Sequence, residues 1–576
     1  MRRAHTGIIP LNGGVRTMRK RLMTLAAALM ALAMLLAGCN GSNNKANGNG
    51  EASASSGATT AADNFNEPGT FPIVKNEETL TVWASPPSWI GDLDDNWFTK
   101  YFEEKTNIKI NWVRANMEDY SDKLNLLLAS NSDLPDVILS WGISNAQQIA
   151  YGSQGLFLPL NDLIDKYGTA TKQVFDYNPI IKSTITAPDG NIYGLPSINE
   201  CFHCTYSHKL WLNQSWLDKL GLEMPTTTDE FYQVLKAFKE QDPNGNGKAD
   251  EIPLTRGSWQ GGIDYFLMNA FIDNEAGNRL MLQDDVIVQA PVQPEWKEGL
   301  AYLHKLYAEG LIDPEFLLED DNKVKILTGT EEAGNKVGAV ASGSLSWVDW
   351  SDANPVKEDY VAVPPLTGPG GVSLAKEYAF GMGVGNFVIT KAAKNPELAM
   401  RFGDAIYQLY LDGDYNLYGE EGDVWVKAKD GEVGLDGSPA KYNVIKSGEQ
   451  PNNFTWGNGL NTFMTNEWRN GQVVTPGVWN SEKILYDETK NKYEGKGPEQ
   501  VMPGTFMMPE DEATEWEELN NAVIQYLDES VAKFVTGSMD LDKDWDKYLT
   551  ELKKIGYDRL TELTQQAYDR QYKGKM

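Results

Sequence analysis

The chain has 576 residues, and because single hydrophobic cores stop growing at about 250–300 residues, we expect two or more lobes. Hydrophobic residues make up 41% and charged residues 23% of the chain, which is typical of a folded globular protein. The formal net charge of −30 repels phosphate backbones and suits a neutral ligand, so we expect no nucleic acid partner. A local cluster of Arg and Lys could still bind an anion.

The N-terminus has the pattern of a secretory signal peptide. A basic start at residues 18–21 is followed by an apolar run over 22–36 and by small residues before Cys39. The apolar run is about 15 residues long, which is shorter than the roughly 20 residues of a membrane-spanning helix. We therefore expect residues 1–38 to be a signal peptide, with translation starting at Met1 or Met18.

Residues 36–39 resemble the bacterial lipobox, in which a diacylglycerol is attached to the cysteine and cleavage precedes it. The resemblance implies a lipoprotein, with a palmitate-type anchor on Cys39, at the extracellular face of the cell membrane. The alternative is an ordinary secretory signal with a chance cysteine. Small polar residues dominate after Cys39 to about Asn66, so we expect a flexible linker over residues 39–75.

Strand and helix patterns alternate in the first part of the chain after the linker. Residues 78–83 and 108–112 have the alternation of strands, and residues 136–139 form a short apolar run. Helical spacing lies between them, over residues 97–102 and 120–129. Strands that alternate with helices predict an α/β fold with central, mostly parallel sheets.

Helical patterns dominate the later part of the chain. Thr227 and Glu230 have the spacing of a capping box that begins a helix. Two helices with apolar faces are predicted near the C-terminus, and they end at Gly537 and Gly556. The C-terminal half is therefore expected to be helix-rich.

Several segments together resemble the extracellular solute-binding protein family 1, in particular the lipoproteins of Gram-positive carbohydrate ABC importers. The segments are residues 134–137, 157–160, 189–196, 225–253, 543–548 and 566–570. The resemblance implies a two-lobed, type II-like periplasmic-binding-protein fold with the ligand held between the lobes and hinge closure on binding.

The resemblance also implies how the chain is divided between the lobes. Residues 76–198 would begin lobe I, and residues 199–335 would begin lobe II. Residues 336–389 would return to lobe I, with a strand at 337–341. Residues 390–576 would be helical and lie mainly in lobe II.

An oxygen-rich loop over residues 242–251 has the spacing of a calcium site, with Gly247 at the sharp turn. Pro253 stands where an EF-hand has its bidentate Glu, so the loop is more similar to the structural calcium loop of alginate-binding proteins. We expect one structural calcium ion; a solvated turn without metal is the alternative. The predicted ligands are Asp242, Asn244, Asn246, Lys248 through its carbonyl, Asp250 and Glu251.

The chain has 17 tryptophans, and sugars are commonly held by aromatic faces, with polar side chains bonding their hydroxyls. Most tryptophans in proteins fill cores. The better candidates lie in loops, chiefly those after predicted strands, because open α/β sheets bind ligands there. The predicted ligand-binding residues are Trp83, Trp141, Glu200, Arg256, Trp259, Trp347, Asp349, Trp350 and Trp456.

Cys201 and Cys204 flank Phe202 and His203 in a single CxxC motif. One such motif with one histidine lacks the second ligand pair of a zinc site. We therefore expect either a local disulfide or two free thiols.

The sequence favours a binding protein over an enzyme. It has four histidines, one of them in the leader, no Gly-x-Ser-x-Gly elbow and no Gly-rich phosphate loop. We expect a monomeric substrate-binding lipoprotein that captures a sugar or oligosaccharide and delivers it to the permease of an ABC importer. A binder of a peptide or other non-sugar solute and a secreted glycoside hydrolase with a carboxylate pair stay open as alternatives.

Overall fold

The structure is a computed structural model. The described residues are 64–116, 119–318, 320–329, 335–349, 351, 354, 356–379, 381–446, 451–457 and 461–575. The expected signal peptide, Cys39 and Trp350 lie outside them. Among the described residues, no helix is long and apolar enough to cross a bilayer.

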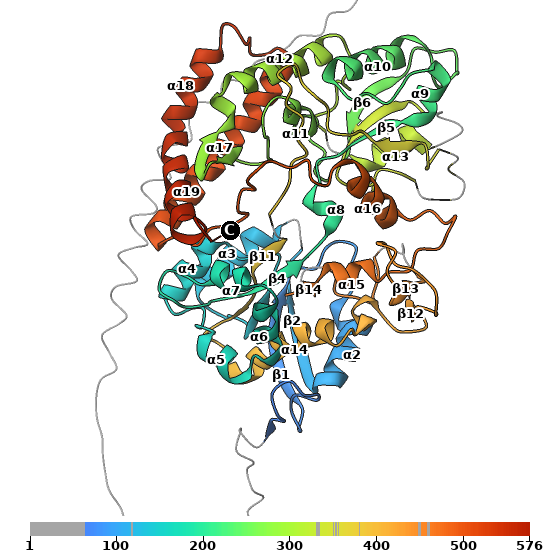
Figure 1. Cartoon of the computed structure of the whole chain (residues 1–576). Helices are drawn as coiled ribbons and strands as arrows, with labels where there is room; N and C mark the ends of the chain where they lie inside the picture. The colour runs from blue at the N-terminus through green and yellow to red at the C-terminus, as the bar shows by residue number, and fades with distance from the viewer. Residues whose placement is uncertain are drawn as a thin grey trace, which may run out of the picture. The chain divides into compact units, whose positions relative to one another are not determined.

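Lobe I is built on a six-stranded sheet with the order β14, β4, β11, β3, β1, β2 (Figure 1). Its strands are β1 (Glu78–Ala84), β2 (Ile108–Arg114), β3 (Val137–Leu139), β4 (Leu195–Asn199), β11 (Met382–Ile389) and β14 (Phe463–Met464). β1 is parallel to β2 and β3, and β4 is parallel to β14. β11 is antiparallel to both of its neighbours, β3 and β4.

Helices cover this sheet and bury its apolar residues. They are α2 (Trp97–Thr106), α3 (Tyr120–Ser130), α4 (Asn145–Ser153), α5 (Asn161–Tyr167), α6 (Thr169–Tyr177), α7 (Pro179–Ile185), α14 (Pro396–Leu411) and α15 (Asn466–Asn470), with short 3-10 turns η2 (Leu93–Asp95) and η6 (Tyr415–Tyr418). A ribbon of β12 (Trp425–Lys427) and β13 (Tyr442–Val444) packs on the same core through Trp425 and Tyr442.

Lobe II is built on a four-stranded sheet with the order β10, β5, β9, β6. Its strands are β5 (Leu210–Asn213), β6 (Ile252–Arg256), β9 (Val337–Ala341) and β10 (Tyr360–Ala362), and a separate hairpin joins β7 (Leu280–Gln283) to β8 (Val286–Gln289). β6 and β9 are parallel, whereas β5 is antiparallel to β9 and β10.

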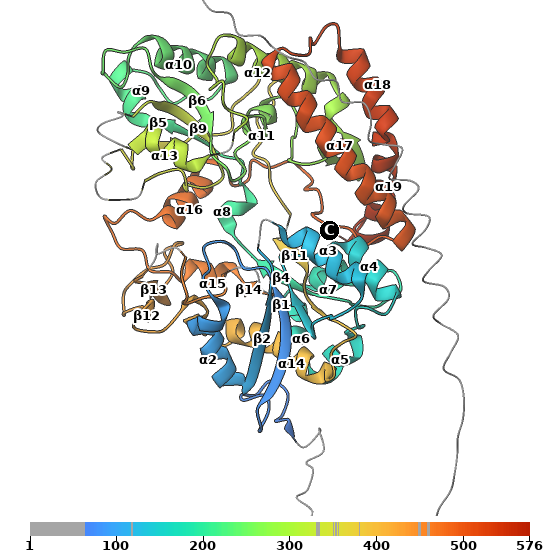
Figure 2. The same cartoon turned by 180° about the vertical axis from the view of Figure 1, so that it is seen from behind.

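The helices of lobe II share one large core with this sheet. They are α8 (Phe202–Thr205), α9 (Gln214–Leu220), α10 (Thr228–Glu240), α11 (Ile263–Leu267), α12 (Pro294–Ala308), α13 (Asp321–Gly329), α16 (Ser481–Lys492), α17 (Glu510–Thr536), α18 (Trp545–Ile555) and α19 (Tyr557–Gln571), with 3-10 turns η4 (Met268–Ala270) and η5 (Ala290–Val292). The long helix α17 packs against α12, α18 and α19 (Figure 2).

The α/β class is confirmed, but two expectations about the lobes are wrong. The strand at 337–341, expected to re-enter lobe I, is β9 of lobe II, between β5 and β6. The strand that returns to lobe I is β11. Residues 390–576, expected mainly in lobe II, are divided between the lobes: residues up to 470 contribute α14 and β14 to lobe I, and α16 to α19 lie in lobe II.

The lobe of β9 could not be predicted because every residue of this strand is buried. Such an apolar strand fits the interior of either sheet. The sheets are mixed rather than mostly parallel. A parallel neighbour is usually reached through a helical crossover, but several strands here follow a segment that comes from the other lobe.

The chain passes between the two sheets three times. Residues 200–209 join β4 to β5, residues 363–381 join β10 to β11, and residues 465–480 lead from β14 to α16. Backbone hydrogen bonds tie the first two segments together, from Tyr378 N to Thr205 O at 2.9 Å and from Asn199 N to Gly381 O at 2.9 Å. The first two crossing segments are therefore hydrogen-bonded to each other.

Local sequence signals are confirmed where they depend on neighbouring residues alone. Thr227 and Glu230 form the capping box of α10. Gly537 and Gly556 end α17 and α18 in the left-handed conformation, with φ of 78° and 106°.

Residues 64–75, expected as the last part of a flexible linker, are bound to lobe I. Phe65 bridges Val74, and the Arg401 guanidinium donates to Asn66 O at 2.6 Å and lies 4.8 Å from the Phe65 ring centroid. Aromatic and polar contacts near residue 65 thus order a stretch whose composition alone favours a linker.

Candidate functional site

Two adjoining cavities of about 430 and 610 Å³ lie where the crossing segments meet both lobes. They share residues 503–505 and Tyr378, Ala379, Gly381 and Met382. Lobe I contributes residues of α7, β4, β11 and α15 to the first cavity and residues of α4 to the second, and lobe II contributes residues of α17 to the second. Their combined size fits an oligosaccharide or another ligand of that size.

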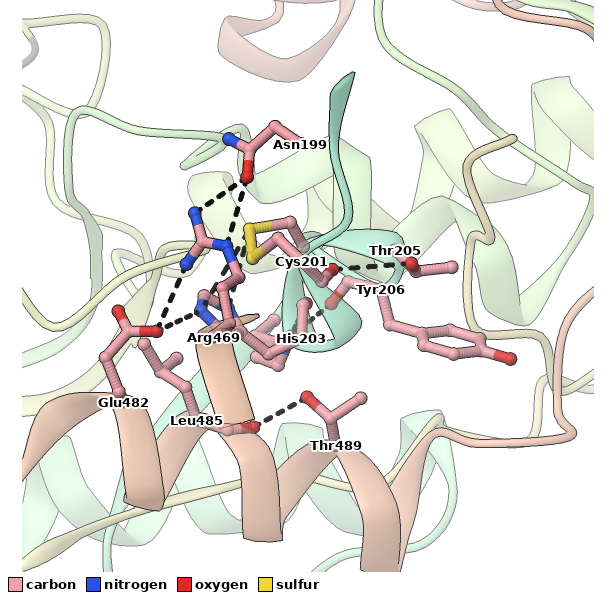
Figure 3. Close-up of a disulfide and its surroundings, with 11 residues drawn as sticks. Asn199, Cys201, His203, Thr205, Tyr206, Arg469, Glu482, Leu485 and Thr489 are labelled. Carbon is pink, nitrogen blue, oxygen red and sulfur yellow. Dashed lines mark hydrogen bonds and ion pairs between the residues drawn. A yellow bond between two sulfur atoms is a disulfide. The ribbon is translucent and has the colours of Figure 1, made fainter. Parts of the chain in front are cut away.

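The first crossing segment carries a disulfide between Cys201 and Cys204, both of which line the first cavity (Figure 3). Of the two alternatives left open by the sequence, the structure has the local disulfide. Because the sulfurs are bonded to each other, they are not free to act as metal ligands.

A charged network lies beside the disulfide and links two crossing segments (Figure 3). Arg469 donates from Nε and Nη2 to Asn199 Oδ1 at 3.0 and 2.9 Å. The Glu482 carboxylate lies 3.5 Å from Arg469 Nη1 and 3.2 Å from His203 Nε2. Burial lowers the pKa of His203, and Glu482 only partly offsets this effect, so the imidazole is neutral at pH 7. The network holds α15, α16 and residue 199 together.

Glu200 lies on the wall of the first cavity and is held by three hydrogen bonds. The Tyr177 hydroxyl donates to both carboxylate oxygens at 2.9 and 2.8 Å, and Asn466 N–H donates to Oε2 at 2.9 Å. Burial, and then Glu200, raise the pKa of Tyr177 to about 12. Tyr177 therefore stays protonated and remains a donor to this carboxylate.

Tyr378 contributes to both cavities, and its position is fixed by His208. The two groups share a hydrogen bond of 2.7 Å between Tyr378 Oη and His208 Nε2, with the rings edge to face at 5.3 Å. Burial lowers the pKa of His208 to about 3. The imidazole is therefore neutral at physiological pH, and it positions Tyr378 without adding charge to the cavities.

The second cavity combines an indole with amides and a carboxylate. Trp516 on α17 lines it, and its Nε1–H donates to Thr564 Oγ1 at 2.8 Å. Asn278 and Asn520 are hydrogen-bonded to each other at 2.8 Å, and Ser144 Oγ donates to Glu517 Oε2 at 3.2 Å. Aromatic surface beside hydroxyl-bonding groups is the combination that sugar sites use.

Three of the predicted ligand-binding tryptophans lie in hydrophobic cores rather than at the cavities. Trp83 and Trp456 are 3% and 4% exposed, and Trp347 is fully buried. Trp456 packs edge to face against Phe98 at 4.7 Å, and Trp347 packs in the same way against Tyr360. Trp83 lies within β1 itself, and all three rings belong to hydrophobic cores.

Among the remaining candidates that the structure describes, only Glu200 lines one of the two cavities. Trp141 donates from Nε1 to Ser85 O, Trp259 is 41% exposed, and Asp349 accepts from Ser351 N–H. Arg256 ends β6. The structure therefore does not bring these four residues together at the cavities.

The sequence reasoning missed most of the cavity wall. Glu377 and Tyr378 lie in a segment without a motif, and Asn145, Trp516 and Glu517 lie on helices. The predicted ligand-binding residues were sought in loops, chiefly those after strands, so residues on helices were not among them. The one available signal was Trp516 in the acidic first part of α17, an aromatic residue among Glu and Asn side chains.

The predicted calcium loop lies between α10 and β6 and is curled around its own oxygens. Asp242 accepts from Asn246 N–H and Gly247 N–H at 3.1 and 3.0 Å, and Asn244 Oδ1 accepts from Asn246 N–H at 3.0 Å. Gly247 has φ of 76°, which a residue with a side chain rarely adopts. The backbone thus has the tight turn that the spacing predicts.

The acidic end of the loop contains the carboxyl groups of Asp250 and Glu251, which differ in their partners. Lys336 lies 2.8 Å from Asp250 and holds the pKa of that carboxyl at about 2. Burial raises the pKa of Glu251, and its Oε1 is buried without a hydrogen-bond partner among the described residues. A buried oxygen without a donor, beside Asp242 and Asp250, is a group that a bound cation would satisfy.

The chain matches the model of the bacterial extracellular solute-binding protein over residues 88–408. It belongs to this family, as the resemblance of its segments indicates.

Relatives with assigned ligands are found by sequence and by structure. Over 363 residues, the chain is 35% identical to the fructooligosaccharide ABC transporter substrate-binding protein FusA of Streptococcus pneumoniae, covering 62% of this chain and 65% of FusA. The chain thus spans less than two thirds of the length of this curated relative.

Two solved structures cover almost the whole of the described chain. One is an EF-hand mutant of Streptococcus pneumoniae FusA in complex with fructo-nystose, with a TM-score of 0.69, 27% identity, and coverage of 86% of this chain and 100% of the other. The other is the alginate-binding protein AlgQ2 without calcium ion, with a TM-score of 0.64, 25% identity, and coverage of 86% and 99%. The two-lobed fold of the solute-binding proteins is therefore confirmed.

Proposed function

We propose that this protein captures an oligosaccharide between its lobes and delivers it to the permease of an ABC importer. The observation that carries the proposal is the pair of adjoining cavities at the crossing segments, whose walls combine amides, carboxylates, hydroxyls and aromatic rings. Membership of the family and the names of FusA and AlgQ2 support it. Closure about the three crossing segments would trap the ligand without chemical change.

The proposal also includes the membrane anchor, the oligomeric state and the absence of catalysis. Cys39 would carry the lipid that anchors the protein to the outer face of the membrane, and the protein would act as a monomer. It would not act as an enzyme. Incubation with each binding sugar, followed by chromatography of the sugar, checks the last point, because any cleavage products would favour the glycoside hydrolase.

Thermal unfolding with a ligand panel tests the function. Kestose, nystose, maltotriose and cellotriose are compared with tripeptides and amino acids, because a ligand that binds the native state raises the melting temperature by mass action. We expect a shift with at least one oligosaccharide. A shift with peptides alone would favour the alternative binder of non-sugar solutes.

A matched pair of tryptophan variants places the binding site. Trp516→Ala removes a ring from the second cavity, so we expect at least a tenfold weaker sugar affinity by isothermal titration calorimetry, which corresponds to about 1.4 kcal/mol. Trp89→Ala removes an exposed ring outside the two cavities and should leave affinity unchanged. Equal effects of the two variants would place the ligand elsewhere.

We further propose that the loop at residues 242–251 holds one structural calcium ion. Side-chain oxygens of Asp242, Asn244, Asn246, Asp250 and Glu251, with the carbonyl of Lys248, are hard ligands of the kind that calcium prefers. The partnerless oxygen of Glu251 supports the fit. The bound ion would fix the end of α10 relative to β6, because the loop joins them.

Removal of calcium is expected to destabilise lobe II. If calcium is present at about 1,000 times its dissociation constant, its loss with a chelator removes about 4 kcal/mol of stability, and differential scanning calorimetry would show a lower melting temperature. Asp242→Ala should abolish the response to the chelator, whereas Glu240→Gln, an exposed change next to the loop, should keep it. A wild-type protein that melts identically with and without chelator would contradict the site.

A further inference from the structure

The ionisable groups on the walls of the two cavities all have the same sign. Glu200 and Glu377 line the first cavity, and Glu275 and Glu517 line the second. Among the described residues that line either cavity, none is Lys, Arg or His. The rest of the polar lining is mainly Asn, Ser and Thr, with the hydroxyls of Tyr378 and Tyr572.

Two buried cations that adjoin lining residues in the sequence are each shared between two carboxylates. Lys376, which precedes Glu377, is 2% exposed and lies 3.4 Å from both Asp273 and Glu275. Arg279, which follows the lining residue Asn278, is 2% exposed and lies 3.2 Å from Asp264 and 2.9 Å from Asp528. Each of these cations is therefore already paired with carboxyl groups of the protein.

In the first cavity, neutral groups donate hydrogen bonds to the two carboxylates. Glu200 accepts from Tyr177 and Asn466, and Glu377 accepts from the Tyr206 hydroxyl at 3.0 Å. These donors are neutral. Arg469, the cation of the neighbouring network, is bound to Asn199 and paired with Glu482, so it does not neutralise the carboxylates on the wall.

We infer that the site selects uncharged oligosaccharides and rejects uronate oligosaccharides. The inference rests on the proposed function and specifies its ligand class. A sugar hydroxyl can donate to a carboxylate, whereas a second carboxylate at the same place has no proton to donate at neutral pH. Like charges held close together in a partly enclosed cavity repel each other strongly, because little water remains to screen them.

Matched neutral and acidic probes test this selectivity. The purified protein is titrated by isothermal titration calorimetry with kestose, nystose, cellotriose and galactotriose, and with trigalacturonate, trimannuronate and triguluronate. We expect the tightest neutral trisaccharide or tetrasaccharide to bind at least tenfold more tightly than any uronate. Galactotriose and trigalacturonate form the closest pair, because they differ mainly in the charged groups.

Charge variants identify the source of the discrimination. In Glu377→Gln/Glu517→Gln, we expect the ratio of uronate to neutral dissociation constants to fall at least threefold. Glu223→Gln removes an exposed carboxylate outside the two cavities and should leave the ratio unchanged. An unchanged ratio in the double variant would overturn the assignment of selectivity to these carboxylates.

The outcomes separate this inference from the proposed function. If a uronate binds as tightly as the best neutral sugar, the inference fails and the carbohydrate-binding function stands. If none of the oligosaccharides binds, the proposed function fails, and the inference fails with it. Neutral binding with at least tenfold weaker uronate binding supports both.

Discussion

Replacement of Trp456 by alanine is expected to lower the free energy of unfolding by about 3–5 kcal/mol, as for other large aromatic residues in cores. The ring lies 4.7 Å from Phe98, 5.1 Å from Trp112 and 5.5 Å from Phe102. Its Nε1–H donates to Thr99 Oγ1 at 2.7 Å. The variant loses these contacts and leaves a cavity in lobe I that the neighbouring rings fill only in part.

Guanidinium unfolding followed by far-ultraviolet circular dichroism measures the loss. Trp89→Ala is the matched control, because this ring is 43% exposed and its removal should change stability by less than about 1 kcal/mol. The sugar affinity of folded Trp456→Ala should stay within threefold of wild type. A large loss of affinity with little loss of stability would restore Trp456 as a ligand-binding residue.

Replacement of Arg279 by leucine is expected to cost about 3–5 kcal/mol of stability, because it leaves buried charge without a partner. The guanidinium is 2% exposed, donates to Gly277 O at 2.6 Å, and pairs with Asp264 and Asp528. Burial raises the pKa of Asp264, and Arg279 opposes this rise. Without the arginine, Asp264 must take up a proton or carry an unpaired charge.

An exposed arginine of the same lobe gives the comparison. Arg559 pairs with Glu515 and Glu562 on the surface, where its side chain is 41% exposed. Arg559→Leu should cost less than about 1 kcal/mol, because surface ion pairs contribute little. Similar losses for the two variants in guanidinium unfolding would show that burial does not decide the contribution of Arg279.

Short-range patterns could be predicted from the sequence. The strands at 78–84 and 108–114, the helix after Thr227, and the helix ends at Gly537 and Gly556 depend on periodicity and capping within a few residues. Each of these elements is amphipathic, begins at a cap or ends at a glycine. The structure has these elements close to the residues at which the sequence pattern predicts them.

The partner of each strand could not be predicted in the same way. β9 and β11 are both apolar runs that follow a crossing or a loop, and their residues do not show which sheet accepts them. In lobe II, β9 pairs with β5 on one side and with β6 on the other. This choice depends on three-dimensional packing rather than on local propensity.

Of the predicted ligand-binding residues that the structure describes, Glu200 alone lies at the two cavities, for a related reason. Its neighbours on the wall come from segments far apart in the sequence, such as Tyr378, Asn466 and Trp516. Each of these residues alone has an ordinary local context. The lining becomes recognisable only when the crossing segments bring the residues together.

The three passages between the sheets also have a consequence for the order of folding. β4 pairs with β14 through Ile198 and Phe463. The edge of the lobe I sheet therefore cannot form until a strand 265 residues later in the chain has been synthesised. Lobe II in turn needs α17 to α19, at the end of the chain, to cover its core. Pairings between distant segments are slow to form. Lobe I cannot be completed before β14 is made, and lobe II cannot be completed before α19 is made. The protein is therefore expected to acquire its native contacts late, after most of its length has been synthesised, and to depend until then on protection from aggregation.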